Sequence, residues 1–420
     1  MRITYLLPDP GIPVGGSKGA SVHVAEVTRA MASAGATVQL LAMRSARPAE
    51  TVPETDSRSH GTAARSRAGR VDLRIFETGS FPRGPGGDPE RRRAVEQFLD
   101  WSEDEARRFR PDLVYERLSL FAGGGTHLAR RLGVPRIVEV NAPVASEREA
   151  HTGLALAADA RQAERDALAG AHVVAVSAAL EPWCRARGAA SVQVIPNGVD
   201  TRRFDASQQA RAAAALRQSL GLEGAQVVGF VGSMKPWHGV ATLLEAVARL
   251  APHRPALRVL LVGDGPAAAA ARERAAEPDL AGRCRFTGAV APDLIPAYLA
   301  ALDVAVAPYD APMADGAFYF SPLKVVEAMA AGRPVVASRF DPIEAMLAGT
   351  GLLVAAASAA SLAGAIGELL DDPARAARLG AAARERAVSG FGWDAVVARI
   401  LAAVPAPPAR PVPDRAAEAV

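Results

Sequence analysis

Cysteine is almost absent from this 420-residue chain, which contains only Cys184 and Cys284. They lie far apart, and neither has a histidine at metal-ligand spacing, so we expect neither a disulfide framework nor a zinc site. A reducing compartment fits this usage. Aromatic residues make up 5% of the sequence and no basic stretch is interleaved with them, so nothing indicates nucleic-acid binding. We expect no metal and no resident cofactor.

A long apolar segment is also missing. The N-terminal apolar run stops at Pro8 after about five residues, which is too short for a signal peptide core. Residues 351–367 are weakly apolar and are predicted to form a strand followed by a helix. The net charge is only +3, and the arginine clusters at 91–93 and 107–110 are predicted to be solvated faces. We therefore expect a cytoplasmic protein, with peripheral contact to an acidic membrane as the open alternative.

Lysine is rare as well, because only Lys18, Lys235 and Lys324 contribute to the 48 basic residues. All three lie in loops marked by Gly or Pro. In a chain whose usual surface cation is arginine, lysine in such a loop indicates a compact charge held near an anion. The alternative is that these are three chance lysines on solvated loops.

Short β-branched or leucine-rich runs alternate with alanine-rich helical patterns, which is typical of parallel sheets with crossover helices. The predicted strands are 3–7, 38–42, 71–75, 113–115, 136–140, 173–176, 193–195, 227–231, 258–262, 284–286, 304–307, 334–337 and 352–354. Residues 45–70 and 80–89 are predicted to be loose loops. The fold class is therefore α/β.

The length indicates two domains, and the turn Pro196-Asn197-Gly198 closes the first. We expect Rossmann-like domains at 1–197 and 198–390, a C-terminal helix at 391–404 that crosses back, and a disordered tail at 405–420. The two parallel sheets would face each other across a cleft, and ligands would bind at the carboxyl ends of their strands.

The most informative segment is YFSPLKVVEAMAAGRPVVA at 319–337. A helix is predicted to begin with Pro322 at its first position, so that the amides of Phe320, Ser321 and Leu323 cluster at the positive end of its dipole. Lys324 adds a charge there. Glu327, one turn deeper on the same face, could accept two hydrogen bonds from a ribose diol. The segment therefore predicts a nucleotide-diphosphate site.

Several motifs together resemble the family-4 glycosyltransferases, which are retaining enzymes of the GT-B fold. The motifs are IPNGVD at 195–200, LVGDGP at 261–266, FTGAV at 286–290, DVAVAP at 303–308 and SPLKVVEAMAAGRPVVA at 321–337. The first domain is similar through GGSKGASVHV at 15–24 and LGVPRIVEVNAP at 132–143. The resemblance implies transfer of a sugar from a nucleotide-diphosphate donor, which serves as co-substrate, without a metal held by an Asp-x-Asp motif.

Carried over residue by residue, Glu327 matches the second glutamate of the family's Glu-x7-Glu motif and is expected to hold the donor ribose. Tyr319 stands where the first glutamate would fall. Ser233 and His238 stand at the positions of the family's arginine and lysine, and Lys235 is expected to supply the missing charge. His238 would contribute a charge when protonated, or one N–H when neutral.

The resemblance extends the donor site to three further residues of the second domain, Gly263, Gly265 and Val290. In the first domain, the loop of Gly15, Gly16 and Lys18 is expected to face the diphosphate or the acceptor. Asn141 stands where many relatives have a histidine, so no acid–base role is expected there.

In such a reaction, negative charge develops on the departing diphosphate. The catalytic candidates are therefore the groups that would stabilise it, Lys324, Lys235 and His238. The acceptor could be a small molecule, a glycan or a lipid-linked sugar. Two alternatives remain open at this point. One is a relative that binds nucleotide sugars without transferring them, and the other is a sugar phosphorylase or epimerase on the same fold.

Overall fold

The structure is a computed structural model that describes residues 1–16, 19–46, 70–79, 81–82, 84–310 and 318–404, and the backbone of 63–68. Lys18 and the tail after Val404 lie outside the described residues. The chain divides into two compact units. The first contains Met1–Val176, Leu180–Ile195 and the chain from Val397 onward, and the second contains Ser177–Ala179 and Pro196–Val396.

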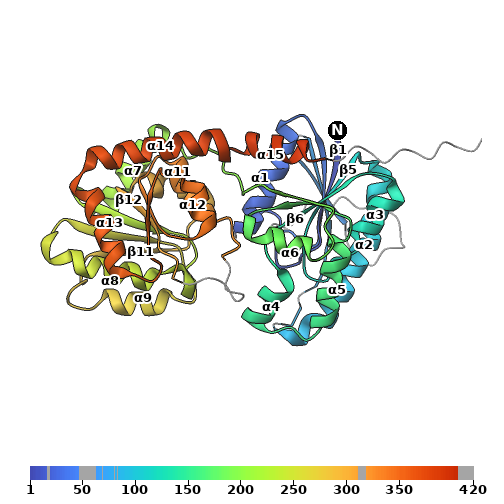
Figure 1. The fold of residues 1–420 in the computed structure, drawn as a ribbon, viewed down its shortest axis with the longest axis horizontal. Coiled ribbons are helices and arrows are strands. Elements are labelled where there is room, and N and C mark those ends of the chain that lie inside the picture. The colour runs from blue at the N-terminus through green and yellow to red at the C-terminus, as the bar shows by residue number, and fades with distance from the viewer. Residues whose placement is uncertain are drawn as a thin grey trace, which may run out of the picture. The chain divides into compact units, whose positions relative to one another are not determined.

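The first unit is built on an eight-stranded sheet with the order β3-β4-β2-β1-β5-β6-β7-β8 (Figure 1). Its strands are β1 (Arg2–Leu7), β2 (Thr37–Ala42), β3 (Ala63–Ala68), β4 (Val71–Phe76), β5 (Leu113–Arg117), β6 (Arg136–Val140), β7 (His172–Ala175) and β8 (Ser191–Val194). Its α-helices are α1 (Gly19–Ser33), α2 (Asp88–Phe109), α3 (Gly125–Leu132), α4 (Val144–Thr152), α5 (Ala157–Leu168) and α6 (Glu181–Arg185).

Two predictions for this unit were wrong. Within the predicted loop 45–70, β3 forms and pairs antiparallel with β4 at the edge of the sheet. The predicted loop 80–89 contains a 3-10 turn at Pro85–Gly87 and the first residues of α2. The strand β3 lies at the edge of the sheet, and the 3-10 turn is only three residues long. Backbone hydrogen bonds hold such elements, and they require no apolar periodicity in the sequence.

The second unit contains a six-stranded parallel sheet with the order β11-β10-β9-β12-β13-β14. Its strands are β9 (Gln226–Val231), β10 (Leu257–Val262), β11 (Cys284–Gly288), β12 (Val304–Ala307), β13 (Val335–Ser338) and β14 (Leu352–Val354). Its α-helices are α7 (Ala206–Ser219), α8 (Val240–Leu250), α9 (Ala268–Ala275), α10 (Ile295–Ala300), α11 (Leu323–Ala330), α12 (Asp341–Leu347), α13 (Ala359–Asp371) and α14 (Pro373–Phe391), while α15 (Trp393–Ala402) spans residues of both units.

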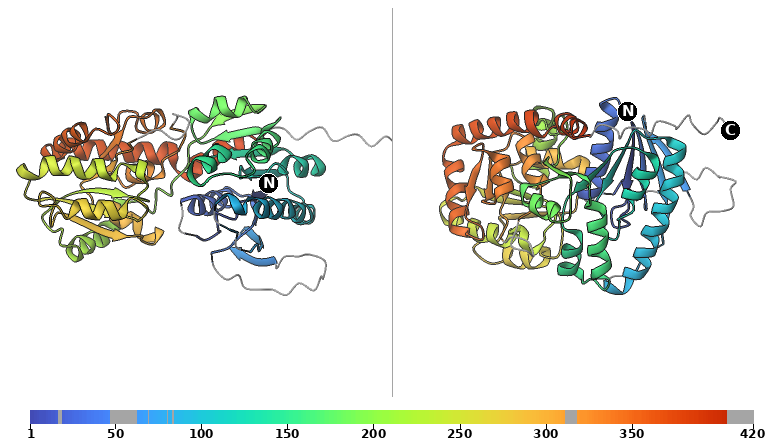
Figure 2. Two further views of the ribbon diagram at one scale, coloured as in Figure 1. Left: turned by 90° about the horizontal axis from the view of Figure 1, so that it is seen from below. Right: turned by 45° about the vertical axis from the view of Figure 1, so that its right-hand side comes forward.

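Helices cover both faces of the second sheet, as the views in Figure 2 show. One apolar core joins the sheet to α8, α9 and α13, and the other joins it to α10, α11, α12 and α14. Because both faces are buried, the central strands are nearly continuous apolar runs, such as QVVGFV in β9 and LRVLLV in β10. The predicted α/β class with two Rossmann-like domains is confirmed.

The strand orders determine where a ligand can bind. In the second sheet the chain winds outward from β9 to β11 and then restarts on the other side with β12, so the switch point lies between β9 and β12. In the first sheet it lies between β1 and β5. Ligands of such sheets bind outside the carboxyl ends of the strands at this point.

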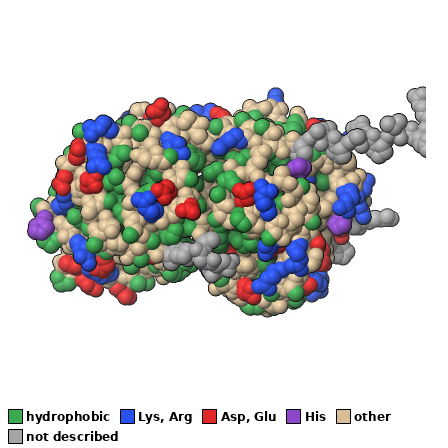
Figure 3. Space-filling model, viewed as in Figure 1, with side chains coloured by type: hydrophobic (Ala, Val, Ile, Leu, Met, Phe, Trp, Pro, Cys, Tyr) green, Lys and Arg blue, Asp and Glu red, His purple; other side chains and the backbone are tan. Residues whose placement is uncertain are grey.

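Basic and acidic side chains are interspersed over the face shown in Figure 3. Among the described residues, no helix has both the length and the apolar character needed to span a membrane.

Candidate functional site

The segment before α11 lies at the switch point of the second unit. Pro322 occupies the N-cap position with φ −73°, and the helix begins at Leu323. The prediction that a helix opens here is confirmed, but Pro322 is one position earlier than the predicted first helical residue. The first amides of an α-helix have no acceptor within the helix. In α11 the amide of Val325 donates to the Pro322 carbonyl at 3.0 Å, which leaves the amides of Leu323 and Lys324 for an anion.

This segment is fixed by two hydrogen bonds inside the second unit. The Ser177 hydroxyl donates to the carbonyl of Tyr319 at 2.7 Å, and the amide of Asn197 donates to the Ser321 hydroxyl at 2.9 Å. The Tyr319 ring is 4% exposed and lies 4.8 Å from the Phe320 ring, centroid to centroid. The backbone before the helix is therefore held in place before any ligand arrives.

Lys324 projects from the first turn of α11 into the interior. Its Nζ is shut off from solvent and has no hydrogen-bond partner in the described part of the chain. It lies 4.3 Å from the centroid of the Phe230 ring and 4.7 Å from that of Tyr309. Burial lowers the pKa of Lys324 to about 7, against the attraction of Glu327. The ring faces offset part of the cost of burying this cation, but they provide no hydrogen-bond acceptor.

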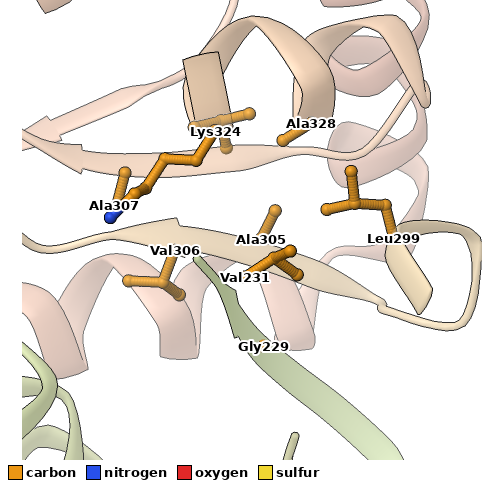
Figure 4. A pocket seen from close by; sticks show the side chains of 9 residues that line it. Gly229, Val231, Leu299, Ala305, Val306, Ala307, Lys324 and Ala328 are labelled. Atoms are coloured by element: carbon orange, nitrogen blue, oxygen red, sulfur yellow. The ribbon is translucent and has the colours of Figure 1, made fainter. Parts of the chain in front are cut away.

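The path of this side chain is visible in Figure 4. It crosses a small pocket between α11 and the sheet, and Lys324 is the one charged residue of its lining (Figure 4). The lining residues are Gly229, Val231, Leu299, Ala305, Val306, Ala307, Lys324, Ala328 and Val335. The apolar stem of Lys324 is thus packed, and only its tip carries the polar chemistry.

Glu327 follows one turn later on the same helix. Burial raises the pKa of Glu327 to about 7, although the charges of Arg203 and Lys324 oppose this shift. Arg203 reaches this region from the segment after β8, and its guanidinium donates to the Asp293 carboxylate at 3.0 Å and to the Pro292 carbonyl at 3.3 Å. Glu327 is half-buried, and a carboxyl within reach of two cationic charges suits a ligand that offers hydroxyl donors.

The loop between β9 and α8 contributes the next groups. Lys235 lies 4.9 Å from the centroid of the Trp237 ring. The Nδ1 of His238 donates to the carbonyl of Ser233, and its ring packs edge-on against that of Tyr309 at 5.2 Å. Burial lowers the pKa of His238 to about 3, helped by the charge of Lys324.

These contacts bear on one prediction, which stays a prediction. We expected His238 to supply a charge, or else its N–H, to the diphosphate. The burial of the ring beside two lysines disfavours the charged form, and the single N–H of the neutral ring is already bonded to Ser233. Ser233 itself is exposed at the arginine position.

Glycines bring the neighbouring loops together. A Cβ on Gly263 would lie 2.0 Å from the carbonyl oxygen of Gly232, and a Cβ on Gly265 would lie 2.7 Å from that of Met234. The amide of Gly232 donates to the Val262 carbonyl at 2.8 Å. Gly263 and Gly265 therefore let the loop after β10 pack against the loop after β9.

Val290 lies directly after β11 and is half-buried against the second-unit core. Its position at the carboxyl edge of the second sheet is that of a residue available to a ligand bound there. The donor-contact role expected for it stays a prediction.

The carboxyl edge of the first sheet contains a buried ionic network around Glu139. This carboxylate accepts hydrogen bonds from the Tyr115 hydroxyl at 2.7 Å and from Arg117 at 2.6 Å, pairs with His23 at 2.8 Å, and accepts from Asn141. Burial alone would raise the pKa of Glu139, but His23, Arg117 and Asn141 lower it well below its usual range.

The residues that we predicted as ligand contacts in the first domain differ in their surroundings. Asn141 is held by its amide against Glu139, and His23 is 4% exposed, which favours the packing role for this histidine over contact with an acceptor. Gly15 has φ +78°. The amide of Gly16 donates to the carbonyl of Pro13 at 3.1 Å and so closes a turn. Their expected contact with a ligand stays a prediction.

Sequence reasoning missed three contributors to the second-unit site. Phe230 and Tyr309 form the walls around the Lys324 ammonium, and Arg203 places a charge near Glu327. Phe230 belongs to an apolar strand and Tyr309 lies two residues after one, so neither stood out as a ligand contact. Arg203 is one of many arginines, and only its spatial position distinguishes it.

The second-unit site contains Arg203, Glu327, Lys324, Lys235 and His238. Its three basic side chains, Arg203, Lys324 and Lys235, and a helix N-terminus would attract a polyphosphate, and the Glu327 carboxyl would accept hydroxyl groups. In the described ranges, no group of three or more His, Cys, Asp or Glu side chains is arranged to hold a metal ion.

Comparison with protein families gives two matches. A model described as "Glycosyl transferases group 1" matches residues 225–372, and one described as "Glycosyltransferase Family 4" matches residues 17–203. Together they include the second-unit site and most of the first sheet.

Three curated relatives show the range of similar proteins. GDP-mannose-dependent alpha-(1-6)-phosphatidylinositol monomannoside mannosyltransferase of Mycolicibacterium smegmatis is 32% identical over 65% of this chain and 71% of its own length. The same enzyme of Mycobacterium tuberculosis is 34% identical over 50% of this chain, and the match spans about half (55%) of its length. 2-Deoxystreptamine glucosyltransferase of Streptomyces kanamyceticus is 35% identical over 48% of this chain and 51% of its own length.

Solved structures share the fold over almost the whole chain. Sucrose-phosphate synthase of Thermosynechococcus elongatus has a TM-score of 0.70 and 22% identity, covering 96% of this chain and 98% of its own. HepE of Anabaena, solved in complex with UDP-glucose, has a TM-score of 0.68 and 22% identity, covering 96% and 100%. The predicted GT-B fold class is confirmed, while the predicted cleft between the two sheets stays a prediction.

Proposed function

The chain belongs to the group 1, family-4 glycosyltransferases, and from this premise we propose that it transfers a sugar from a nucleotide-diphosphate donor to an acceptor with retention of the anomeric configuration. The donor would bind in the second unit. Its diphosphate would lie against the start of α11, and its ribose would donate hydrogen bonds to Glu327.

The observation that carries this proposal is the Lys324 ammonium. It is buried at the positive end of α11 with two aromatic faces and no hydrogen-bond partner in the described chain. A buried ammonium without an acceptor is costly for the fold. A phosphate group would supply both the acceptor oxygens and the negative charge that this position lacks.

The same groups account for catalysis. When the bond between the sugar and the diphosphate breaks, negative charge grows on the leaving phosphate and positive charge on the sugar ring. Lys324, Lys235 and the first amides of α11 would stabilise the leaving group, and one well-placed donor contributes roughly 3–4 kcal/mol to such a step. The departing phosphate would take the proton of the acceptor hydroxyl, so no protein nucleophile is required.

The donor and acceptor classes are supported by the relatives. Two of them are named as GDP-mannose-dependent, and one solved neighbour holds UDP-glucose. The mannosyltransferases are named for a phosphatidylinositol mannoside, which supports a lipid-linked acceptor and, with it, contact with a membrane surface. The first unit would receive this acceptor near Gly15, Gly16 and Asn141.

Differential scanning fluorimetry of the purified protein tests the donor site directly. UDP, GDP, ADP and TDP are added singly, followed by their sugars, to the wild type and to Lys324→Met. We expect one base to raise the melting temperature of the wild type and not of the variant. If no nucleotide raises it, or if the variant responds equally, the proposed donor site is wrong.

Release of the free nucleoside diphosphate from its sugar, measured without and with lipid-linked and soluble sugars, separates a transferase from a protein that only binds. Release above the rate without enzyme supports transferase chemistry. Binding without any release would mean that the chain retains the site alone.

A further inference from the structure

His238 is half-buried in the second-unit site, with one nitrogen already bonded. Its Nδ1 faces the carbonyl oxygen of Ser233, and because a carbonyl can only accept, Nδ1 must carry the proton. In the neutral ring Nε2 then presents a lone pair. No described residue hydrogen-bonds to this Nε2.

The surroundings keep the ring neutral. Lys324 and Lys235 are its charged neighbours, and the rings of Trp237 and Tyr309 pack against it at 5.9 and 5.2 Å. In the ligand-free protein, a further positive charge beside these two lysines is unfavourable, so the ring is neutral and its Nε2 presents an acceptor, whereas a phosphate oxygen needs a donor. The group that faces Nε2 must be a hydrogen-bond donor.

The contacts along the site indicate which part of a donor this is. Glu327 follows Lys324 by one turn of α11, whereas the Lys324 ammonium and the His238 ring lie against the same two rings, those of Phe230 and Tyr309. Lys324 thus joins Glu327, on its own helix, to His238, across these rings. With the ribose at Glu327 and the diphosphate at Lys324, the next group along a nucleotide sugar is the sugar itself.

Tyr319 stands where the Glu-x7-Glu motif has its first glutamate, so this position offers no carboxylate to a sugar hydroxyl. Tyr319 is 4% exposed, and its carbonyl accepts from Ser177 at 2.7 Å. A hydrogen-bond acceptor for the sugar must therefore come from another residue. His238 offers a lone pair on Nε2, and its ring lies against the same two aromatic rings as the Lys324 ammonium.

We propose that His238 is a specificity-determining residue, whose Nε2 accepts a hydrogen bond from a hydroxyl of the transferred sugar. This inference rests on the proposed function, because it takes the diphosphate position at Lys324 as given. It changes the role of His238 from a group that stabilises the leaving phosphate to one that selects the sugar.

Two substitutions of His238 distinguish the roles of its two ring nitrogens. His238→Asn places an amide N–H near the position of Nδ1, so the bond to Ser233 is kept while the Nε2 acceptor is lost. His238→Gln reaches farther and returns an acceptor oxygen near the position of Nε2. Isothermal titration calorimetry would compare UDP with UDP-glucose and GDP with GDP-mannose for the wild type and both variants.

The expected result is a split between the nucleotide and the sugar. His238→Asn should weaken binding of the preferred nucleotide sugar by about 5- to 150-fold, the range for a lost partner of a buried polar group. It should leave the affinity for the matching nucleoside diphosphate within about twofold, and His238→Gln should recover part of the loss.

Three outcomes would overturn the inference. In the first, the two ligands weaken equally in His238→Asn, which would mean that His238 acts on the diphosphate or only on the loop. In the second, neither ligand weakens. In the third, the wild type binds the nucleotide sugar no better than the diphosphate. A wild type that binds no nucleoside diphosphate at all would instead refute the proposed donor site, so the two failures are distinguishable.

Discussion

Replacing Lys324 with methionine should make the protein more stable while it removes donor binding. Methionine keeps most of the apolar stem in the pocket and removes only the buried charge. Burial lowers the pKa of Lys324 from 10.5 to about 7, and each unit corresponds to about 1.4 kcal/mol. Since the residue as a whole is partly exposed, solvent screening reduces the gain to on the order of 2–4 kcal/mol.

The sign of this effect depends on pH. The unfolded lysine titrates near 10.5 and the folded one near 7, so the native state is penalised increasingly as the pH falls between these values and fully below 7. The advantage of Lys324→Met should therefore be close to zero near pH 10.5 and largest at pH 6–7. For a unit of this size, the gain corresponds to a rise of about 5–10 °C in melting temperature.

Differential scanning fluorimetry of the ligand-free protein from pH 6 to 10 would measure this. Lys235→Met is the matched control, because it removes a lysine that lies on the face of Trp237 in the same site. Lys235→Met should change the free energy of unfolding by no more than about 1 kcal/mol. A Lys324→Met protein that melts below the wild type at pH 7, or whose gain does not change with pH, would refute the argument that this ammonium is buried without a partner.

Three further predictions concern other groups. Glu327→Gln should raise the melting temperature at pH 8 but not at pH 4.5. Burial raises the pKa of this carboxyl from 4.5 to about 7, so the cost of ionising it in the native state grows as the pH rises above 4.5 and is complete above 7; an equal gain at both values would contradict this. Gly239→Ala should destabilise the second unit by more than about 2 kcal/mol, because Gly239 has φ +71° and a Cβ there would lie 1.5 Å from the Pro308 carbonyl oxygen. The control Gly364→Ala, with no neighbour within 4 Å, should raise the free energy of unfolding by about 0.5–1 kcal/mol. Chemical denaturation that ranks the two variants the other way would disprove the packing argument. Glu139→Gln should cost about 3–5 kcal/mol at pH 7. Because the pKa of Glu139 is lowered in the native state, its charge stabilises the fold fully above the unfolded pKa and progressively less below it, so the loss should shrink as the pH falls below 4; a loss independent of pH would mean that the charge is not the cause.

The sequence predicted the framework of the fold because burial on both faces of a parallel sheet leaves a strong pattern. A strand is present at every predicted run, with ends that differ by a few residues. The edge strand β3 was not predicted, because its sequence AARSRA has no apolar alternation and the strand depends on backbone pairing with β4.

The candidate site was predicted only in part. Spacing along one helix placed Lys324 and Glu327 on the same face, since that depends on local geometry alone. The depth of Lys324 could not be predicted, because its walls come from Phe230 at β9 and Tyr309 after β12, which only the tertiary fold brings together. The hydrogen-bonding role of His238 likewise depends on the way its loop closes onto Ser233.

A crystal structure of the protein with the nucleoside diphosphate that stabilises it most would test the central claim most directly. The account predicts the β-phosphate at the first amides of α11, within 3.2 Å of the Lys324 ammonium by ordinary hydrogen-bond geometry (about 2.7–3.2 Å). It also predicts the ribose hydroxyl groups at Glu327. A diphosphate bound away from α11, with Lys324 still enclosed by Phe230 and Tyr309 and without an acceptor, would contradict it.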